Sequence, residues 1–196
     1  MSFKHLLKEK ILQFHPHFNE EVLELGLQKF KCMDVQAGDH IVNSGDVISE
    51  LFIAEKSISR AYRVSEDGEE QTLWIEPELK FLTDMESFRN GTPNFMNIQL
   101  YEDSEVMYID RKDLVELYAT YHDWSLFGNA LMEDYLIYIF SITNLMFSND
   151  ATSNYQLIEK HYARYLQVVP LKHIASRLNV SPITISRIRG DKQKKK

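Results

Sequence analysis

The sequence contains very little cysteine, proline or glycine. Cys32 is the single cysteine among 196 residues, so one chain cannot form an internal disulfide or bind an iron–sulfur cluster through several thiolates. Five prolines and seven glycines exclude a collagen-like or Pro/Gly-rich low-complexity chain. Because 44% of the residues are hydrophobic and 26% are charged, we expect a globular protein that buries a substantial core.

Long apolar runs are absent as well. The most apolar stretch, residues 135–147, is shorter than the roughly 20 residues that a membrane-spanning helix needs. The N-terminal residues carry charges where a secretory signal would be apolar. We therefore expect a cytoplasmic protein with no membrane association, and a lone cysteine is consistent with that reducing compartment.

Metal-ligating side chains do not cluster along the chain. His15 and His17 flank a proline, but no acid or histidine follows them at metal-ligand spacing. Residues 31–110, where strand patterns dominate, contain His40 as their only histidine. No pairing of a nucleophile with a base is evident either. We therefore expect no metal, no cofactor and no enzymatic activity.

Charge is divided unevenly between the two ends of the chain. Residues 160–196 contain ten basic side chains and one acidic side chain, whereas residues 1–159 contain 12 basic and 28 acidic ones. The overall net charge of −7 therefore conceals a basic C-terminal end. Such a basic end supplies the phosphate attraction on which DNA binding depends.

Residues 171–189 have the pattern of a helix-turn-helix. Asn179 stands where the tight turn needs a residue that tolerates a positive φ. Ser181 is placed as the N-cap of the second helix, and Pro182 is its first residue. Apolar side chains mark the inner faces of both helices: Leu171, Ile174, Ala175, Leu178, Ile185 and Ile188. The alternative interpretation is a short amphipathic helical hairpin without a DNA-binding role.

The middle of the chain favours short antiparallel strands. Turn signals at 37–39, 44–46, 66–68 and 90–91 separate β-rich runs at 40–42, 51–54, 57–64, 70–75, 96–101 and 106–109. Many short strands at this spacing are typical of a sandwich or small barrel. We expect two or three short helices over 3–30, a helical region from 112 to 121 and a helix near 155–166.

A long helix over residues 123–148 follows the strands. Apolar side chains recur along it at spacings of three or four, as in a coiled-coil seam: Trp124, Phe127, Leu131, Tyr135, Tyr138, Ile142 and Leu145. We expect these side chains to pack against a second copy of the chain. The alternative is a buried helix of a monomer. Residues 148–154 are polar and predict a hinge.

The order of these segments resembles the cyclic-AMP receptor protein family (Crp/Fnr regulators). The resemblance runs from about residue 20 to 190; its most specific parts are the Gly-Asp turns at 38–39 and 45–46, the Asp67-Gly68 hairpin turn and the helix-turn-helix. It implies an α+β fold: an N-terminal β-jelly roll (cyclic-nucleotide-binding-like) domain over 1–122, a dimerisation helix and hinge over 123–149, and a helix-turn-helix domain over 150–196. It also implies a homodimer that binds double-stranded DNA, with RNA polymerase as a further candidate partner.

The effector pocket departs from the family pattern. Cyclic-nucleotide binders of the family hold the ribose and phosphate with a Gly-Glu pair and a later Arg-Ser or Arg-Thr pair. Thr83 and Asp84 stand at the first positions and Asn94 and Phe95 at the second, so the cationic partner that a buried phosphate needs is missing. Phe81 and Phe88 make the region apolar. We expect no cyclic-nucleotide binding, and either an apolar or uncharged effector or none.

The resemblance also assigns the DNA contacts. Arg187 stands where the family places an arginine on a base edge, and arginine to guanine is the commonest specific contact. Thr184, Ser176 and Arg189 are expected on phosphates. The other candidates lie at the start of the recognition helix: Ser181, Pro182, Ile183 and Ser186. The sequence ends seven residues after Arg189, so we expect no β-wing.

These observations predict a homodimeric, sequence-specific transcription regulator that cyclic nucleotides do not gate. The competing hypothesis is a ligand-binding or scaffolding protein with a jelly-roll pocket and a degraded DNA reader. The sequence does not name the effector, the target DNA or the sign of regulation.

Overall fold

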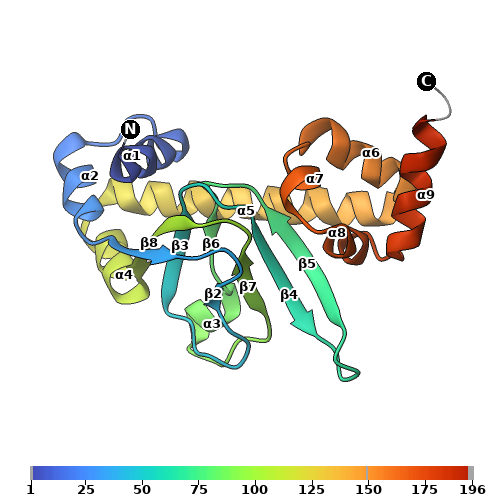
Figure 1. The fold of residues 1–196 in the computed structure, drawn as a ribbon. Coiled ribbons are helices and arrows are strands. Elements are labelled where there is room, and N and C mark those ends of the chain that lie inside the picture. The colour runs from blue at the N-terminus through green and yellow to red at the C-terminus, as the bar shows by residue number, and fades with distance from the viewer. Residues whose placement is uncertain (1, 149, 194–196) are drawn as a thin grey trace.

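The computed structural model of the protein describes residues 2–148 and 150–193 (Figure 1). The side chains of residues 142, 144–148 and 191–193 lie outside this description. A β-sandwich occupies the middle of the molecule, an N-terminal helical layer covers one side of it, and a C-terminal helical domain lies at the other end (Figure 1). One long helix, α5 (His122–Ser148), runs from the first to the last of these parts.

The sandwich consists of two four-stranded antiparallel sheets. The first sheet has the order β1-β8-β3-β6 and the second β2-β7-β4-β5. Their bounds are β1 Lys31–Val35, β2 His40–Val42, β3 Glu50–Ala54, β4 Ser59–Val64, β5 Glu70–Glu76, β6 Phe81–Leu82, β7 Asn97–Leu100 and β8 Ser104–Asp110. The predicted runs correspond to β2, β3, β4, β5, β7 and β8. The short strands β1 and β6 were not predicted.

Strand β3 shows how the layers are stacked. Phe52 and Ala54 point into the core between the two sheets, and Leu51 and Ile53 point into a second core beneath the helices. Alternate side chains of a strand lie on opposite faces, so this strand is buried on both. The sheet β1-β8-β3-β6 is therefore the middle layer between the other sheet and the helices.

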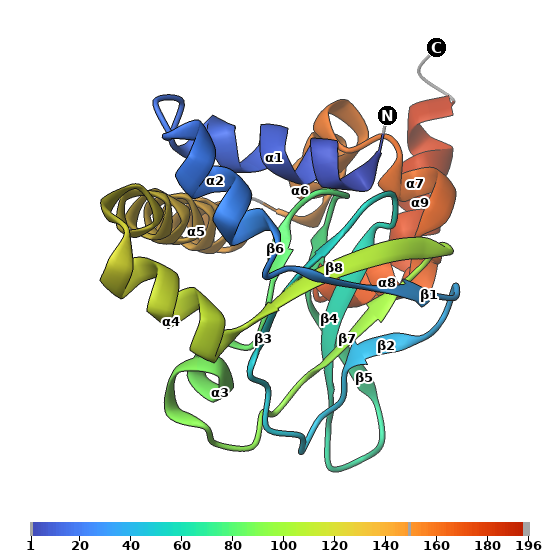
Figure 2. The ribbon, with the colours of Figure 1, turned by 90° about the vertical axis from the view of Figure 1, so that its left-hand side faces the viewer.

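The helical layer is built from α1 (Phe3–Phe14), α2 (Glu20–Leu27), α4 (Arg111–Thr120) and the first half of α5. Figure 2 looks along α5 and shows α1, α2 and α4 close to this helix. The side chains of Trp124 and Phe127 are fully buried there. Trp124 Nε1 donates to the carbonyl of Val22 at 3.1 Å, and its ring lies against Gly26, where a Cβ atom would come within 2.0 Å of Cζ2.

The predicted dimer seam is wrong for its first three members. Trp124, Phe127 and Leu131 are buried in the core of their own chain, so they cannot form a surface for a second copy. Tyr135 and Tyr138 are half-buried on the same side of the helix. Ile142 and Leu145 lie outside the described side chains. A spacing of three or four residues identifies an apolar face of a helix, but it does not tell whether that face packs inside the chain or against a second copy. Here it identifies the face of α5 that packs inside the chain.

The opposite face of α5 is apolar and exposed. Its large hydrophobic side chains are 37–71% exposed in the single chain: Met132, Leu136, Ile137 and Phe140. Contiguous exposed apolar surface on a helix marks a site of protein contact. No helix among the described residues is both long and apolar enough to cross a membrane.

The C-terminal domain contains α6 (Ala151–His161), α7 (Tyr165–Val168), α8 (Leu171–Arg177) and α9 (Pro182–Gln193). Asp150 caps α6 by accepting from the backbone N–H groups of Thr152 and Ser153. The helix therefore begins inside residues 148–154, where a hinge was predicted, and the part of that hinge from Ala151 onward is wrong.

Candidate nucleic-acid interface and effector pocket

The helix-turn-helix has the local chemistry that the sequence predicts. Asn179 adopts φ 54° in the turn between α8 and α9. Ser181 Oγ accepts from the Thr184 backbone N–H at 3.1 Å and so caps α9, which begins at Pro182. Ile185 is fully buried against α8 residues Ile174 and Ala175. These contacts set the orientation of α9 on its own domain.

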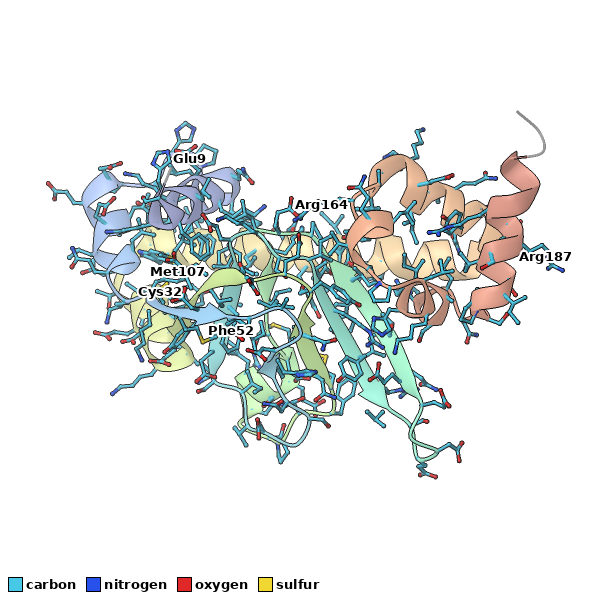
Figure 3. All side chains as sticks on the ribbon, viewed as in Figure 1. Glu9, Cys32, Phe52, Met107, Arg164 and Arg187 are labelled. Carbon is cyan, nitrogen blue, oxygen red and sulfur yellow. The ribbon has the colours of Figure 1, made fainter. Side chains whose placement is uncertain are left out.

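The outer face of α9 is free of protein contacts at several candidate DNA-binding positions. Ile183 is 81% exposed, and Pro182, Ser186 and Arg187 are exposed as well. Arg187 points away from the rest of the molecule at its far end (Figure 3). A capped helix that presents an arginine and a branched apolar side chain can offer both to base edges in a major groove.

Two of the predicted phosphate contacts are engaged inside the protein. Ser176 Oγ donates to the Glu70 carbonyl at 3.1 Å and accepts from the Thr72 N–H at 2.9 Å. Arg189 Nε donates to the hydroxyl of Tyr155 at 2.6 Å. The Ser176 hydroxyl and the Arg189 Nε are therefore occupied within the protein in this arrangement, and their assignment to phosphates stays a prediction. The Thr184 hydroxyl lies 2.9 Å from that of Ser181.

Ser176 belongs to a larger contact in which α8 lies on strand β5. Arg60 on β4 is 1% exposed; its Nε donates to Thr72 Oγ1 at 2.9 Å, and its Nη1 donates to Glu70 Oε2 at 2.7 Å and lies 3.1 Å from His173 Nε2. Tyr101 Oη lies 2.8 Å from His173 Nδ1. We call Arg60, Glu70, Thr72, Tyr101, His173 and Ser176 the docking network.

The docking network defines the protonation state of His173. Arginine can only donate hydrogen bonds, so Nε2 of His173 accepts from Arg60 and Nδ1 carries the proton, which it donates to the Tyr101 hydroxyl. Burial, and then the positive charge of Arg60, lower the pKa of His173 to about 4. Arg60 Nη2 has no hydrogen-bond partner among the described residues. The network was not predicted, because its members lie on elements far apart in the sequence.

Arg164 links the two domains at a second place. Its guanidinium donates to Glu78 at 2.6 Å, to Glu102 at 2.7 Å and to the carbonyl of Lys56 at 3.0 Å. Ile58 and Ile75 of the sandwich also belong to the apolar core of the C-terminal domain. The C-terminal domain is therefore docked on its own sandwich through both polar and apolar contacts.

The predicted effector-pocket residues do not converge on a ligand site. Asp84 is 2% exposed and caps α3 (Met85–Asn90) by accepting from the Ser87 N–H at 2.8 Å. Asn94 donates to the carbonyls of Asn43 and Asp46 and accepts from the N–H of Met96. Asp84 therefore stabilises the start of α3, and Asn94 holds two loops of the sandwich together.

The remaining pocket candidates are divided among different surroundings. Thr83 donates to the carbonyl of Glu50 at 2.9 Å, and Phe95 is 54% exposed. Phe88 packs against the core beneath the helices. Phe81 packs there too, with its ring centroid 5.7 Å from that of Phe127.

A small cavity remains between Phe81, Thr83, Tyr135 and Tyr138, and its volume is about 50 Å³. Sites for small organic ligands usually measure about 300–1,000 Å³. In the structure described, this cavity is therefore too small for a nucleotide.

Comparisons with known proteins agree with this architecture. Residues 32–121 match the family model of the cyclic nucleotide-binding domain. The structure of FixK2 from Bradyrhizobium japonicum is similar with a TM-score of 0.71 and 13% identity, over 85% of each chain. CLP of Xanthomonas campestris, a c-di-GMP responsive global regulator, is similar with a TM-score of 0.68 and 14% identity, over 90% of this chain and 93% of that one. The chain has the fold of the Crp/Fnr regulators. No match by sequence is found among curated proteins.

The Crp/Fnr fold extends over nearly the whole chain. The catabolite activator protein of Thermus thermophilus is similar over 95% of this chain and 87% of its own, with a TM-score of 0.53 and 18% identity. Crp/Fnr regulators are a non-enzymatic family. The described residues contain no group of three or more side chains placed to hold a metal ion. The similarity confirms the predicted α+β fold and its resemblance to this family.

Proposed function

We propose that the protein is a homodimeric, sequence-specific DNA-binding transcription regulator of the Crp/Fnr type that cyclic nucleotides do not gate. The observation that carries the proposal is the outer face of α9. Ile183 and Arg187 are exposed there, on a helix that is capped by Ser181 and packed on its own domain. An exposed branched apolar side chain one helical turn from an arginine suits a thymine methyl near a guanine.

The dimer uses the exposed face of α5. Leu136, Ile137 and Phe140 are 54%, 66% and 71% exposed, and pairing this face with a second copy removes them from water. The two copies then lie about a two-fold axis along α5. The recognition helices of such a dimer read half-sites about 34 Å apart.

Cyclic nucleotides do not fit the sandwich. Asp84 and Asn94 are occupied by backbone groups, and the neighbouring cavity holds about 50 Å³, well below the range of about 300–1,000 Å³ for sites of small organic ligands. Any ligand of this cavity is therefore small.

Each of the three parts of the chain has its own role in this proposal. Residues 1–122 form the effector domain, 123–149 the dimerisation helix and hinge, and 150–196 the DNA-binding domain. Double-stranded DNA and a second copy are the partners, RNA polymerase is a further one, and the cytoplasm is the compartment.

Selection of DNA sites tests the proposal. The purified protein, without added ligand, is incubated with randomised duplex DNA near physiological salt, about 150 mM. We expect enrichment of a two-fold motif with half-sites one helical turn apart. A scaffolding protein with a degraded reader would bind weakly and without a motif, and this binding would vanish as salt rises.

A matched pair of variants sharpens the test. Arg187→Ala and Lys160→Ala each remove one exposed positive charge, from α9 and from α6. We expect Arg187→Ala to lose about 1–3 kcal/mol of binding free energy on the selected DNA site and to become less selective at one base position. We expect Lys160→Ala to keep the same sequence preference. Equal losses for both variants would contradict direct readout by Arg187.

A further inference from the structure

A cavity between the sandwich and the DNA-reading domain is far larger than the one beside Phe81. It measures about 510 Å³, within the range of about 300–1,000 Å³ for sites of small organic ligands. The end of β5, Tyr138 of α5, α6 and the turn between α8 and α9 all contribute to its wall. We call it the interdomain cavity. The cavity is therefore bordered by the sandwich, by α5 and by the C-terminal domain.

Most of the wall of the interdomain cavity is apolar or aromatic. Leu157 and Ile158 of α6 line it together with Ile75 and Val180. The rings of Tyr162 and Tyr165 stack with centroids 4.9 Å apart and an interplanar angle of 24°, and both rings line the cavity. A flat aromatic surface of this kind favours a planar ring as its partner.

A few ionisable groups are set into this apolar wall. Glu76 is 6% exposed; burial raises the pKa of its carboxyl to about 7 although Tyr138 hydrogen-bonds to it. The Arg177 guanidinium lies in the same wall, and burial lowers its pKa. Lys80 also lines the cavity and pairs with Asp134 at 3.1 Å.

The balance of these charges favours an anion. Near neutral pH the buried Glu76 is partly protonated, and a protonated carboxyl donates a hydrogen bond instead of repelling a negative charge. Arginine presents five donors in a planar fork that fits a carboxylate, so it can serve a ligand in addition to its contacts within the protein. An anion buried without such a partner would not recover its desolvation cost.

We propose that the interdomain cavity is a small-molecule site for an aromatic monocarboxylate, with the ring against the apolar wall and the carboxylate at Arg177. A ligand there contacts the sandwich, α5 and the helix-turn-helix at once. It therefore favours the arrangement in which the reader is docked, because a ligand shifts an equilibrium toward the state that it binds better. This site adjoins the degenerate pocket around Thr83 and Phe81, with which it shares Glu76, Lys80 and Tyr138 as wall residues.

Calorimetric titration of the full chain without DNA tests the site independently of DNA binding. The probes are 2-naphthoate and its uncharged analogue 2-naphthamide. We expect saturable binding of one 2-naphthoate per chain and at least about tenfold weaker binding of the amide. Absence of saturable binding up to about 1 mM 2-naphthoate overturns the proposal, and equal affinities for the two probes overturn its assignment to a carboxylate.

Two substitutions on α6 locate the binding. Leu157→Trp fills the cavity, whereas Gln156→Trp places the same ring on the exposed face of the same helix. We expect the first to abolish binding of 2-naphthoate and the second to leave it unchanged. Unaltered binding by a folded Leu157→Trp variant places the ligand elsewhere and overturns the proposal.

Arg177→Gln provides the test if thermal melting shows that Leu157→Trp does not fold. It removes the charge and keeps hydrogen-bonding capacity, and Lys160→Gln removes an exposed charge from α6 as its control. We expect Arg177→Gln to lower the affinity for 2-naphthoate about tenfold, to a value close to the affinity for 2-naphthamide. Retention of the full preference for the carboxylate in this variant would also overturn the proposal.

Discussion

Protonation of His173 should weaken the docking of the C-terminal domain on the sandwich. The imidazole accepts a hydrogen bond from Arg60 at Nε2, 3.1 Å away. A second proton would replace this hydrogen bond with two facing donors that both carry positive charge. Lys172 adds to that repulsion, and Glu70, 3.6 Å from Nε2, opposes it. Burial of the ring, together with this repulsion, makes the docked imidazole resist protonation, and its pKa is about 4 instead of the ordinary 6.5.

The direction of the pH dependence follows from this depressed pKa. Above pH 6.5 the imidazole is neutral in both states, and docking retains its full strength. As the pH falls from 6.5 toward 4, the undocked imidazole binds a proton and the docked one does not, so docking loses free energy. One pKa unit corresponds to about 1.4 kcal/mol, which sets a ceiling of about 2 kcal/mol at pH 5. Relaxation of the contact and entry of water around the protonated imidazole reduce our expectation to about 1 kcal/mol.

Comparison with His173→Gln isolates the effect. Glu76 titrates with the opposite sign, because its raised pKa makes its contribution to stability grow as the pH falls. Both proteins contain Glu76, so its contribution cancels between them. Between pH 7.5 and pH 5, we expect the free energy of unfolding in urea to fall by about 1 kcal/mol more for the wild type than for the variant.

A carbon–proton NMR titration of the histidine rings measures the pKa directly, and the His173→Gln spectrum assigns the missing signal. A titration midpoint near 6.5, or the same pH dependence of unfolding for both proteins, would refute the reasoning from the docking network.

Three further predictions concern the dimer, the helical layer and the turn. Phe140→Glu should convert the dimer to a monomer in sedimentation analysis, whereas Val115→Glu, on the exposed side of α4, should not. Gly26→Ala should lower the free energy of unfolding by about 2–4 kcal/mol, because its Cβ meets a buried tryptophan ring; Gly190→Ala, with open space around it, should be neutral or slightly stabilising in the same urea titration. Asn179→Val should cost about 1–2 kcal/mol by the same measurement, because φ is positive there. A dimeric Phe140→Glu, a stable Gly26→Ala or an unaffected Asn179→Val would contradict the respective contact.

The helix-turn-helix was predictable because its determinants are local. A residue that tolerates positive φ, a serine cap and a proline at the first helical position occur within four residues, 179–182, and each acts on its immediate neighbours. The β4–β5 hairpin is similar, since Ser65 accepts from the N–H of Glu69 and closes the turn within five residues. Strands β1 and β6 depend instead on partners that are distant in the sequence: β1 pairs with β8, and β6 pairs with β3.

The orientation of α5 and the docking network could not be predicted for the same reason. The apolar repeat of α5 was visible, but only the packing of α1 and α2 shows that Trp124 faces inward. Arg60 has the sequence character of an exposed strand residue, and it is buried because α8, more than a hundred residues later, lies on it. Ser176 was assigned to DNA from its position in the motif, and the hydroxyl contacts β5 instead.

The hydrogen bonds of Asp84 and Asn94 bear on how this chain could change over evolution. Replacing Asp84 by glutamate would lengthen the side chain that caps α3. Replacing Asn94 by arginine would remove two hydrogen bonds between loops of the sandwich and a local one from Met96. Each step toward a phosphate clasp would therefore reduce stability before any ligand was gained. A chain with these hydrogen bonds would need several substitutions at once before a cyclic nucleotide could control it. Binding of a new effector would therefore evolve more easily at another surface of the molecule.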